Sequence, residues 1–197
     1  MHNLHKFRGK YRIPSTRLQT WDYSNDGAYF VTICTKNREY SFGTIKNEKL
    51  TETQQSKICL QCWLDLPNHY HNCILDEFTI MPDHVHGIIF IDNDLPTIPA
   101  VETGLKPVST AVSTDKPVSI TKISKQYSLS EIIRGFKTFT ARKINEHQNT
   151  QGQPFWQSRF YDRIIRNENE LNHIREYIIN NPLQWETDKN NLENLYI

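Results

Sequence analysis

Residues 73–91 read Cys73-Ile-Leu-Asp-Glu-Phe-Thr-Ile80-Met81-Pro-Asp-His84-Val-His86-Gly-Ile-Ile-Phe-Ile91. Two runs rich in aliphatic and aromatic residues flank the break at Met81-Pro-Asp, which predicts a hairpin of two central strands. Residues two apart on a strand point to the same face, so His84 and His86 should present their imidazoles together while Val85 faces the core. Such a pair can bind a divalent metal ion.

Earlier in the chain, residues 28–35 are β-branched and aromatic and predict the first strand. An apolar stripe over residues 51–66 predicts a helix. After the hairpin, Ser128 and Glu131 have the spacing of a capping box, and apolar residues recur from there at helical intervals up to Ile144.

Residues 155–165 predict a fourth strand. Asn167, with Glu170 three residues later, can open a last helix, which Pro182 is expected to end. The order is then strand, helix, two strands, helix, strand, helix. It predicts the α+β class, with a ferredoxin-like antiparallel sheet, helices on one face and an added C-terminal helix.

Length and composition favour one soluble domain, because 197 residues with 37% hydrophobic and 23% charged residues can form a single core. We expect the domain to span residues 28–185, after a basic arm at 1–27 and before a tail at 186–197. Residues 93–127 are rich in Thr, Ser, Val and Pro and predict a flexible insertion that the fold does not need. No membrane span or secretion signal is visible, so we expect a cytoplasmic, nucleoid-associated protein.

Positive charge is concentrated in two places although the formal net charge is only +1. Residues 1–20 carry five basic residues and no acid, which suits an arm lying along phosphates or a solubilising tail. Residues 128–166 also carry a basic excess. The candidate DNA contacts there are Arg134, Lys137, Arg159, Arg163 and Arg166. A solvated helix face is the alternative role for those on the helix that begins after Ser128.

Cys59 and Cys62, with His69, His71 and Cys73 downstream, have the residue types of a zinc site. The alternative is that both cysteines belong to the apolar stripe of the helix predicted over residues 51–66. We favour that second interpretation.

Tyr177 and Asn181 are four residues apart on the predicted last helix and therefore share a face. An amide oxygen together with the two imidazoles and water suits Mg²⁺ or Mn²⁺ better than a closed zinc site. Alternatively, Tyr177 packs in the core and Asn181 is simply a residue near the end of the helix.

Four strings, in this order, resemble those of a known family. They are Tyr29-Phe-Val-Thr, Met81-Pro-Asp-His-Val-His, Phe155-Trp-Gln-Ser-Arg-Phe-Tyr-Asp-Arg-Ile-Ile-Arg and Tyr177-Ile-Ile-Asn-Asn-Pro. The family is that of the REP-associated tyrosine transposases, single-tyrosine members of the HUH (His-hydrophobic-His) nucleases that are related to transposases of small insertion sequences. The resemblance covers roughly residues 28–185 apart from the insertion.

This resemblance implies that His84 and His86 bind metal, that Tyr177 is the nucleophile, and that Asn181 takes the place of a Gln or Asn that completes the metal site. It implies cleavage and rejoining of single-stranded or hairpin DNA at repeated extragenic palindromes, through a 5′-phosphotyrosine intermediate and with Mg²⁺ or Mn²⁺. The related proteins act as monomers or as homodimers.

The same sequence features allow three other interpretations. A histidine-triad nucleotide hydrolase would need a third histidine where Ile88 stands, so that class is excluded. A non-cleaving DNA-binding or regulatory protein with the same fold stays open, as does a purely structural domain. Tyr161 is the rival nucleophile, but its predicted strand offers no partner ligand at helical spacing.

Overall fold

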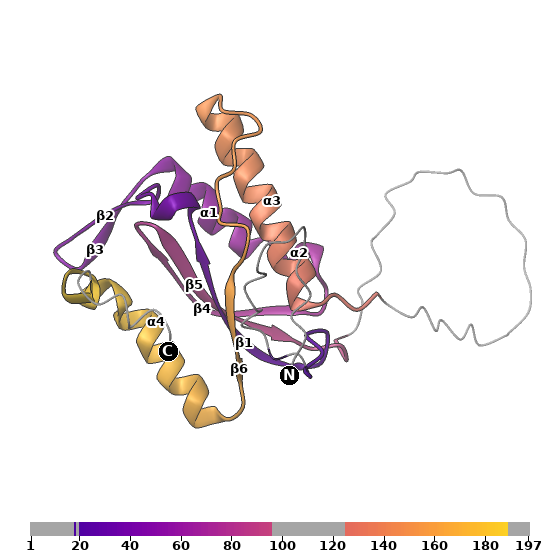
Figure 1. Ribbon diagram of the computed structural model, residues 1–197. Helices are drawn as coiled ribbons and strands as arrows, with labels where there is room; N and C mark the ends of the chain where they lie inside the picture. Colours follow the sequence, from indigo (N-terminus) through magenta and orange to yellow (C-terminus); the bar gives the residue numbers. More distant parts are fainter. Residues whose placement is uncertain (1–17, 19, 96–124, 189–197) are drawn as a thin grey trace, which may run out of the picture.

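A computed structural model describes residues 18, 20–95 and 125–188 of this chain (Figure 1). Most of the predicted arm, insertion and tail therefore lies outside the described residues. The main sheet contains β1 (Gly27–Cys34), β4 (Cys73–Met81), β5 (His84–Ile91) and β6 (Tyr161–Ile165) in the order β4-β5-β1-β6. All three neighbouring pairs are antiparallel. The ferredoxin-like prediction is confirmed, but β4 lies at an edge, so the hairpin contributes one central strand instead of two.

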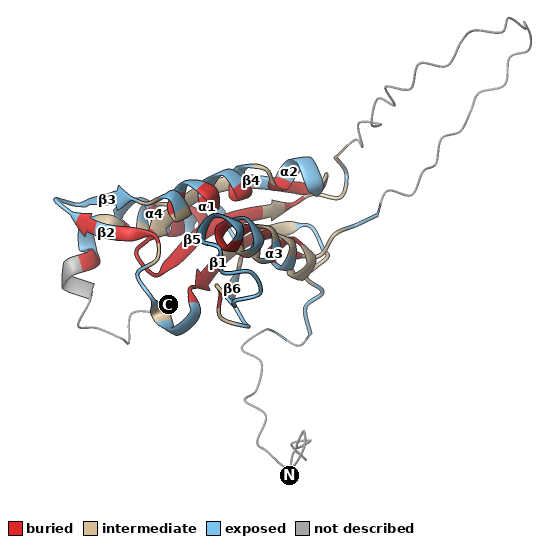
Figure 2. Ribbon diagram, turned by 90° about the horizontal axis from the view of Figure 1, so that it is seen from above, coloured by how far each residue is buried: buried red, intermediate tan, exposed pale blue. Residues whose placement is uncertain are grey.

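Alternating residues of the central strands form two separate cores. Tyr29, Val31 and Ile33 of β1 pack with buried residues of α1 (Gln54–Leu64) and α3 (Leu129–Gln148). On the opposite face, Ala28 packs with Ile174 and other residues of α4 (Glu168–Asp188). Figure 2 shows the buried positions concentrated along the strands between these helices. Two helices therefore cover one face of the sheet, and the added helix crosses the other.

Two short elements differ from the predicted helix at 51–66. Residues 43–52 form a hairpin of β2 (Gly43–Lys46) and β3 (Lys49–Glu52), and α1 begins only after Thr53, whose hydroxyl caps it by accepting from the Ser56 N–H. A second break precedes the four-residue helix α2 (Leu66–His69). The turn residues Asn47 and Glu48 both have positive φ, yet neither is Gly, so the usual sequence signal for such a turn is missing.

The capping box at Ser128 and Glu131 is present and opens α3 as predicted. The fourth strand is shorter than predicted, because residues 155–160 form only an isolated bridge between Trp156 and Thr35, which follows β1 and precedes the 3₁₀ turn η1 (Lys36–Arg38). The prediction that Pro182 ends the last helix is wrong, since α4 continues to Asp188. No helix in the described part of the chain is long and apolar enough to cross a bilayer.

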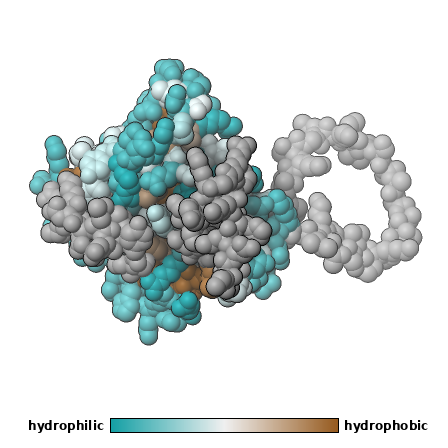
Figure 3. Space-filling view, viewed as in Figure 1, coloured by the Kyte–Doolittle hydropathy of each residue, from teal (hydrophilic) through white to brown (hydrophobic). Residues whose placement is uncertain are grey.

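The face of the molecule seen in Figure 3 is largely hydrophilic over the coloured residues, including the exposed side of α3. The candidate metal-binding and nucleophilic residues lie instead between the sheet and α4.

Candidate functional site

His84 and His86 lie on the face of β5 that α4 covers, and both side chains are buried. Their Nε2 atoms are 2.9 Å apart. Val85, between them, points to the other face and packs in the larger core. The alternation of the strand thus brings two imidazole nitrogens to one point.

Each imidazole is oriented through its other nitrogen by a different group. Asp83 Oδ1 lies 2.6 Å from Nδ1 of His84, and the second oxygen of Asp83 pairs with Arg38 at 2.9 Å. Thr32, the cross-strand partner of His86 on β1, places its hydroxyl 2.8 Å from Nδ1 of His86. Since an ionised carboxylate only accepts hydrogen bonds, Nδ1 of a neutral His84 carries the proton and its Nε2 presents a lone pair.

Both histidines are held in the neutral form. Burial lowers the pKa of His84, although Asp83 opposes this, and burial lowers the pKa of His86 well below its usual value, with the neighbouring His84 adding to the effect. Neutral imidazole is the form that coordinates a metal ion.

Helix α4 lays one stripe of residues over this pair. The Tyr177 hydroxyl is 3.5 Å from Nε2 of His86. Two turns later the Trp185 ring lies 5.9 Å from the His84 ring. Asn181 is buried and stands halfway between them at helical spacing, so it shares their face toward the histidines.

The donor set fits a metal ion. The two Nε2 atoms are 2.9 Å apart, which is a hydrogen-bond distance. Two imidazole nitrogens this close could both coordinate one ion. Within residues 18, 20–95 and 125–188 no group of three His, Cys, Asp or Glu side chains could hold a metal. A further protein ligand in this region would be of another type, such as the Asn181 amide.

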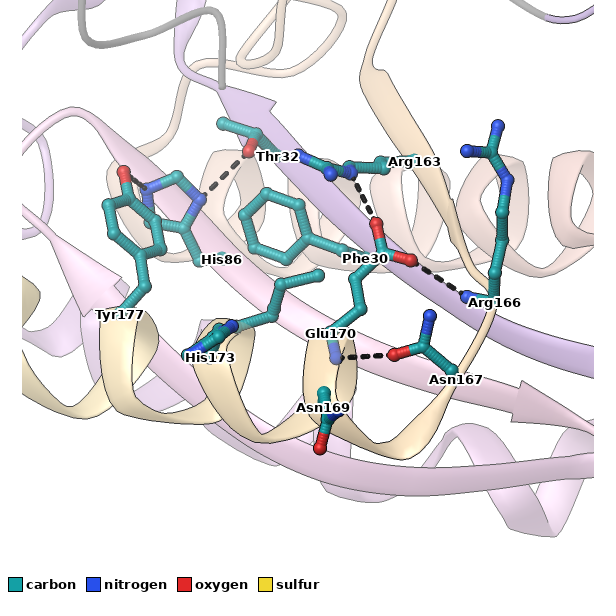
Figure 4. Close-up of a pocket in the computed structure, with 11 residues that line it drawn as sticks. Phe30, Thr32, His86, Arg163, Arg166, Asn167, Asn169, Glu170, His173 and Tyr177 are labelled. Atoms are coloured by element: carbon teal, nitrogen blue, oxygen red, sulfur yellow. Dashed lines mark hydrogen bonds and ion pairs between the residues drawn. The ribbon is translucent and has the colours of Figure 1, made fainter.

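A cavity of about 740 Å³ opens beside the pair and runs along α4. Figure 4 shows it between β1 and β6 on one side and the helix on the other. Tyr177, His86 and Thr32 line one end, and Arg163 and Arg166 line the other. The hydroxyl of Tyr177 is therefore within reach of molecules in this space.

Comparison with known proteins places the chain in a family. The model of the family described as "Transposase IS200 like" matches residues 102–181, which include Tyr177 and Asn181 but not the two histidines. Residues 102–181 of this chain belong to the IS200-like transposase family. An uncharacterised protein of Haemophilus influenzae (strain ATCC 51907 / DSM 11121 / KW20 / Rd) is 35% identical over 178 residues, or 89% of this chain and 91% of that protein. A structure of a REP-associated tyrosine transposase bound to a REP hairpin aligns with a TM-score of 0.53 at 15% identity, over 87% of this chain and 74% of that one, and shares its fold.

In this IS200-like chain the five candidate DNA contacts do not lie together. Arg163 and Arg166 line the cavity with Tyr177. Lys137 instead donates to the backbone oxygens of Gln157, Ser158 and Arg159, the nearest at 2.6 Å, and burial lowers its pKa. Arg134, like Lys137, is on α3, across the sheet from Tyr177, and is exposed. Arg159 is exposed and precedes β6.

Cys59 and Cys62, the two cysteines of the zinc interpretation, pack in the core. Cys59 and Cys62 are buried on α1, and burial raises the pKa of the Cys59 thiol well above its usual value, so the thiol keeps its proton. His69 is exposed and pairs with Asp65 at 2.9 Å. These contacts support the core interpretation over zinc.

Sequence reasoning missed the residues that support the histidines. Asp83 stands in the quoted Met81-Pro-Asp-His string and Thr32 in Tyr29-Phe-Val-Thr, but neither was assigned a role. Adjacency to His84 was a usable signal for Asp83. The sequence carries no such signal for Thr32. Its role is visible only from the strand register, which pairs Thr32 with His86 although the two residues are 54 positions apart in the chain.

Proposed function

We propose that the chain is a metal-dependent endonuclease and strand transferase acting on single-stranded DNA at hairpins or repeats. The observation that supports it most is the Tyr177 hydroxyl, 3.5 Å from Nε2 of His86, beside two neutral imidazoles whose Nε2 atoms are 2.9 Å apart. Family membership supports DNA as the substrate, and the solved neighbour bound to a REP hairpin suggests its form.

His84 and His86, through Nε2, and Asn181, through its amide oxygen, would hold Mg²⁺ or Mn²⁺. When bound, the ion would polarise the oxygens of the scissile phosphate and stabilise the charge that develops on them. Asp83 and Thr32 keep the two ring nitrogens directed at that position.

Tyr177 is the nucleophile in this mechanism. Its phenolic oxygen forms a bond to phosphorus and loses its proton, while the bond from phosphorus to the 3′-oxygen breaks and that oxygen takes up a proton. The products are a 5′-phosphotyrosine and a 3′-hydroxyl. Because the phosphodiester is exchanged and not hydrolysed, another 3′-hydroxyl can attack the phosphotyrosine and join strands.

The nucleophile is tested by incubating end-labelled, hairpin-bearing single-stranded DNA with Mn²⁺ and following the covalent protein–DNA adduct. Wild type and the matched control Tyr161→Phe should form the adduct, and Tyr177→Phe should not. Tyr161 is a suitable control because it is exposed and lies across from Thr32 on the same sheet face. A covalent adduct formed by Tyr177→Phe would show that another residue is the nucleophile. If wild type forms no adduct with any of a range of hairpins, the result would favour a non-cleaving DNA-binding protein.

The metal site is tested separately, by titrating Mn²⁺ and following its paramagnetic resonance without DNA. His84→Ala and His86→Ala should weaken binding by more than the roughly 10- to 100-fold typical of losing a supporting residue. The exposed histidine variant His69→Ala should bind as wild type does. Equal affinity in all four proteins would refute the site.

A further inference from the structure

The cavity beside Tyr177 extends well beyond the reacting groups. Its volume of about 740 Å³ lies in the range of about 300–1,000 Å³ typical of ligand sites. It continues past Tyr177 to the corner where β6 turns into α4 (Figure 4). A phosphate between the histidines and Tyr177 would leave most of this space for what is attached to it.

The middle of the cavity presents ring and apolar surfaces. Phe30 stacks on His86, with ring centroids 5.3 Å apart and planes at 22°, and it meets Tyr177 edge-on at 6.1 Å. Phe30 is only half-buried, so part of its ring faces the cavity. His173 and Ile174 of α4 line the opposite wall. Flat apolar walls of this kind favour an aromatic base.

The far end of the cavity is polar and carries positive charge. Glu170 accepts hydrogen bonds from Nε of Arg163 at 2.8 Å and from the backbone N–H of Arg166 at 2.9 Å. Its carboxylate therefore pairs with the Arg163 guanidinium, whereas its hydrogen bond to Arg166 is to the backbone N–H. Asn169 adds an exposed amide that can both donate and accept hydrogen bonds. Such an end suits a sugar-phosphate backbone and the edge of a base.

We propose that this cavity binds the base and sugar of one unpaired nucleotide next to the scissile phosphate, with the base against Phe30 and His173, its polar edge toward Asn169, and the following phosphate near Arg166. The inference rests on the proposed function for the position of the scissile phosphate. It adds that the chain reads a single-stranded nucleotide directly through the cavity.

The experiment measures DNA binding in EDTA, where cleavage does not contribute. A pool of single-stranded DNA with a randomised segment is selected on the wild-type protein, and the selected oligonucleotide is fluorescently labelled. Abasic sites are then introduced one position at a time, and affinity is measured by anisotropy. One position should lose about 10-fold in affinity, the order expected for a single base stacked on aromatic groups.

Variants connect that position to the cavity. Asn169→Ala and His173→Ala should bind the intact oligonucleotide about 10-fold more weakly, and the abasic one no more weakly than wild type does. The matched controls are Asn172→Ala, on the same helix, and His147→Ala, on α3; neither residue lines the cavity, and both variants should behave as wild type. Thermal melting of each variant identifies any loss that comes from unfolding.

The inference is overturned if no abasic position matters, if the cavity variants weaken the intact and abasic oligonucleotides equally, or if single deoxynucleoside monophosphates bind as tightly as the selected DNA. The last result would make the cavity a site for free nucleotides. The proposed function fails independently, by the absence of a covalent adduct with Mn²⁺. If one abasic position weakens binding through the cavity residues but no covalent adduct forms, the nucleotide site is retained and the proposed nuclease activity is refuted. If an adduct forms but no abasic position matters, the nuclease activity is retained and the nucleotide site is refuted.

Discussion

The rings of His84 and His86 are each oriented by a hydrogen bond at Nδ1, and the two hydrogen bonds differ in strength. One oxygen of the Asp83 carboxylate pairs with Arg38 at 2.9 Å, and the other lies 2.6 Å from Nδ1 of His84, the short distance of a strong hydrogen bond. The hydroxyl of Thr32 can donate to or accept from Nδ1 of His86, so His86 can adopt either tautomer. At the residue scale, His84 is therefore the more rigidly oriented of the two proposed metal ligands.

Asp83→Asn should weaken Mn²⁺ binding by roughly 10- to 100-fold, because the amide keeps the shape but loses the charge that orients His84. Calorimetric titration with Mn²⁺ measures the change, and the exposed variant Asp94→Asn serves as the control. An unchanged dissociation constant in Asp83→Asn would show that Asp83 has no part in metal binding.

Helix α4 keeps the site closed over the sheet although it contains Pro182. Proline lacks the N–H that would bond to the carbonyl of Ile178, and this usually ends or bends a helix. Here the following turn buries Trp185 against Met81 and Ile45. That burial offsets the lost hydrogen bond and explains why the helix continues beyond the predicted end.

Trp185→Ala should lower the free energy of unfolding by about 3 kcal/mol, the low end for removing a buried large aromatic side chain. The exposed neighbour gives the control, since Leu183→Ala should change it by no more than about 0.5 kcal/mol. Urea unfolding followed by circular dichroism measures both. Equal losses in the two variants would mean that Trp185 does not anchor the helix.

A second anchor of α4 depends on pH. Arg175 donates two hydrogen bonds to Asp76 of β4, at 2.7 and 2.9 Å, and these bonds lower the pKa of Asp76. The pair therefore stabilises the fold fully above the unfolded pKa of about 4 and loses its contribution as pH falls through the lower folded pKa. Glu77 and Glu168 are the other charged groups near Arg175.

Asp76→Asn should lower the free energy of unfolding by less than about 1 kcal/mol near neutral pH. The side chains of Asp76 and Arg175 are 18% and 33% exposed, so solvent screens the ion pair. The difference from wild type should shrink in acid. Urea unfolding near neutral pH and in acid measures this difference in unfolding free energy. Arg175→Gln and the double variant complete a double-mutant cycle for the pair. A difference that grows in acid would contradict the assigned sign.

On the scale of the whole molecule, one buried side chain ties both ends of the segment 96–124 to the domain. The Asn72 amide donates to the side chain of Asn93 at 2.9 Å and to the backbone oxygen of Tyr127 at 3.0 Å. The two ends therefore leave the domain close together. This supports the prediction that the fold does not need the insertion.

Replacing residues 96–124 by a Gly/Ser linker of about six residues should leave the thermal midpoint within a few degrees of wild type, since loop-closure entropy changes slowly with length. Differential scanning calorimetry measures it. Asn72→Ala in the intact chain is the contrasting variant and should melt lower, because it leaves the ends of the segment untied. A linker variant that fails to fold would show that the insertion contributes to the core.

The histidines and Tyr177 meet within a single chain, so the proposed site needs no second subunit. A mixture of His86→Ala and Tyr177→Phe proteins should therefore form no more covalent adduct with hairpin DNA than either variant alone. Recovery of adduct in the mixture would show that two chains share the site and that the tyrosine acts in trans.

The sequence by itself determined the features that depend on near neighbours. The capping box at Ser128 and the alternation that puts His84 and His86 on one face arise from hydrogen bonds and side-chain directions within a few residues. The order of strands and helices was likewise sufficient for the ferredoxin-like plan. The β2–β3 hairpin escaped prediction because its turn lacks the glycine that normally marks one.

Only the tertiary structure decided what meets those residues. The hydroxyl of Thr32 reaches His86 through strand register, Tyr177 reaches it through the docking of α4, and α4 passes Pro182 because Trp185 is buried against another hairpin. Each of these contacts joins segments that are far apart in the chain. Their free energy comes from packing across the sheet, and local sequence patterns do not encode which distant partner a side chain will find.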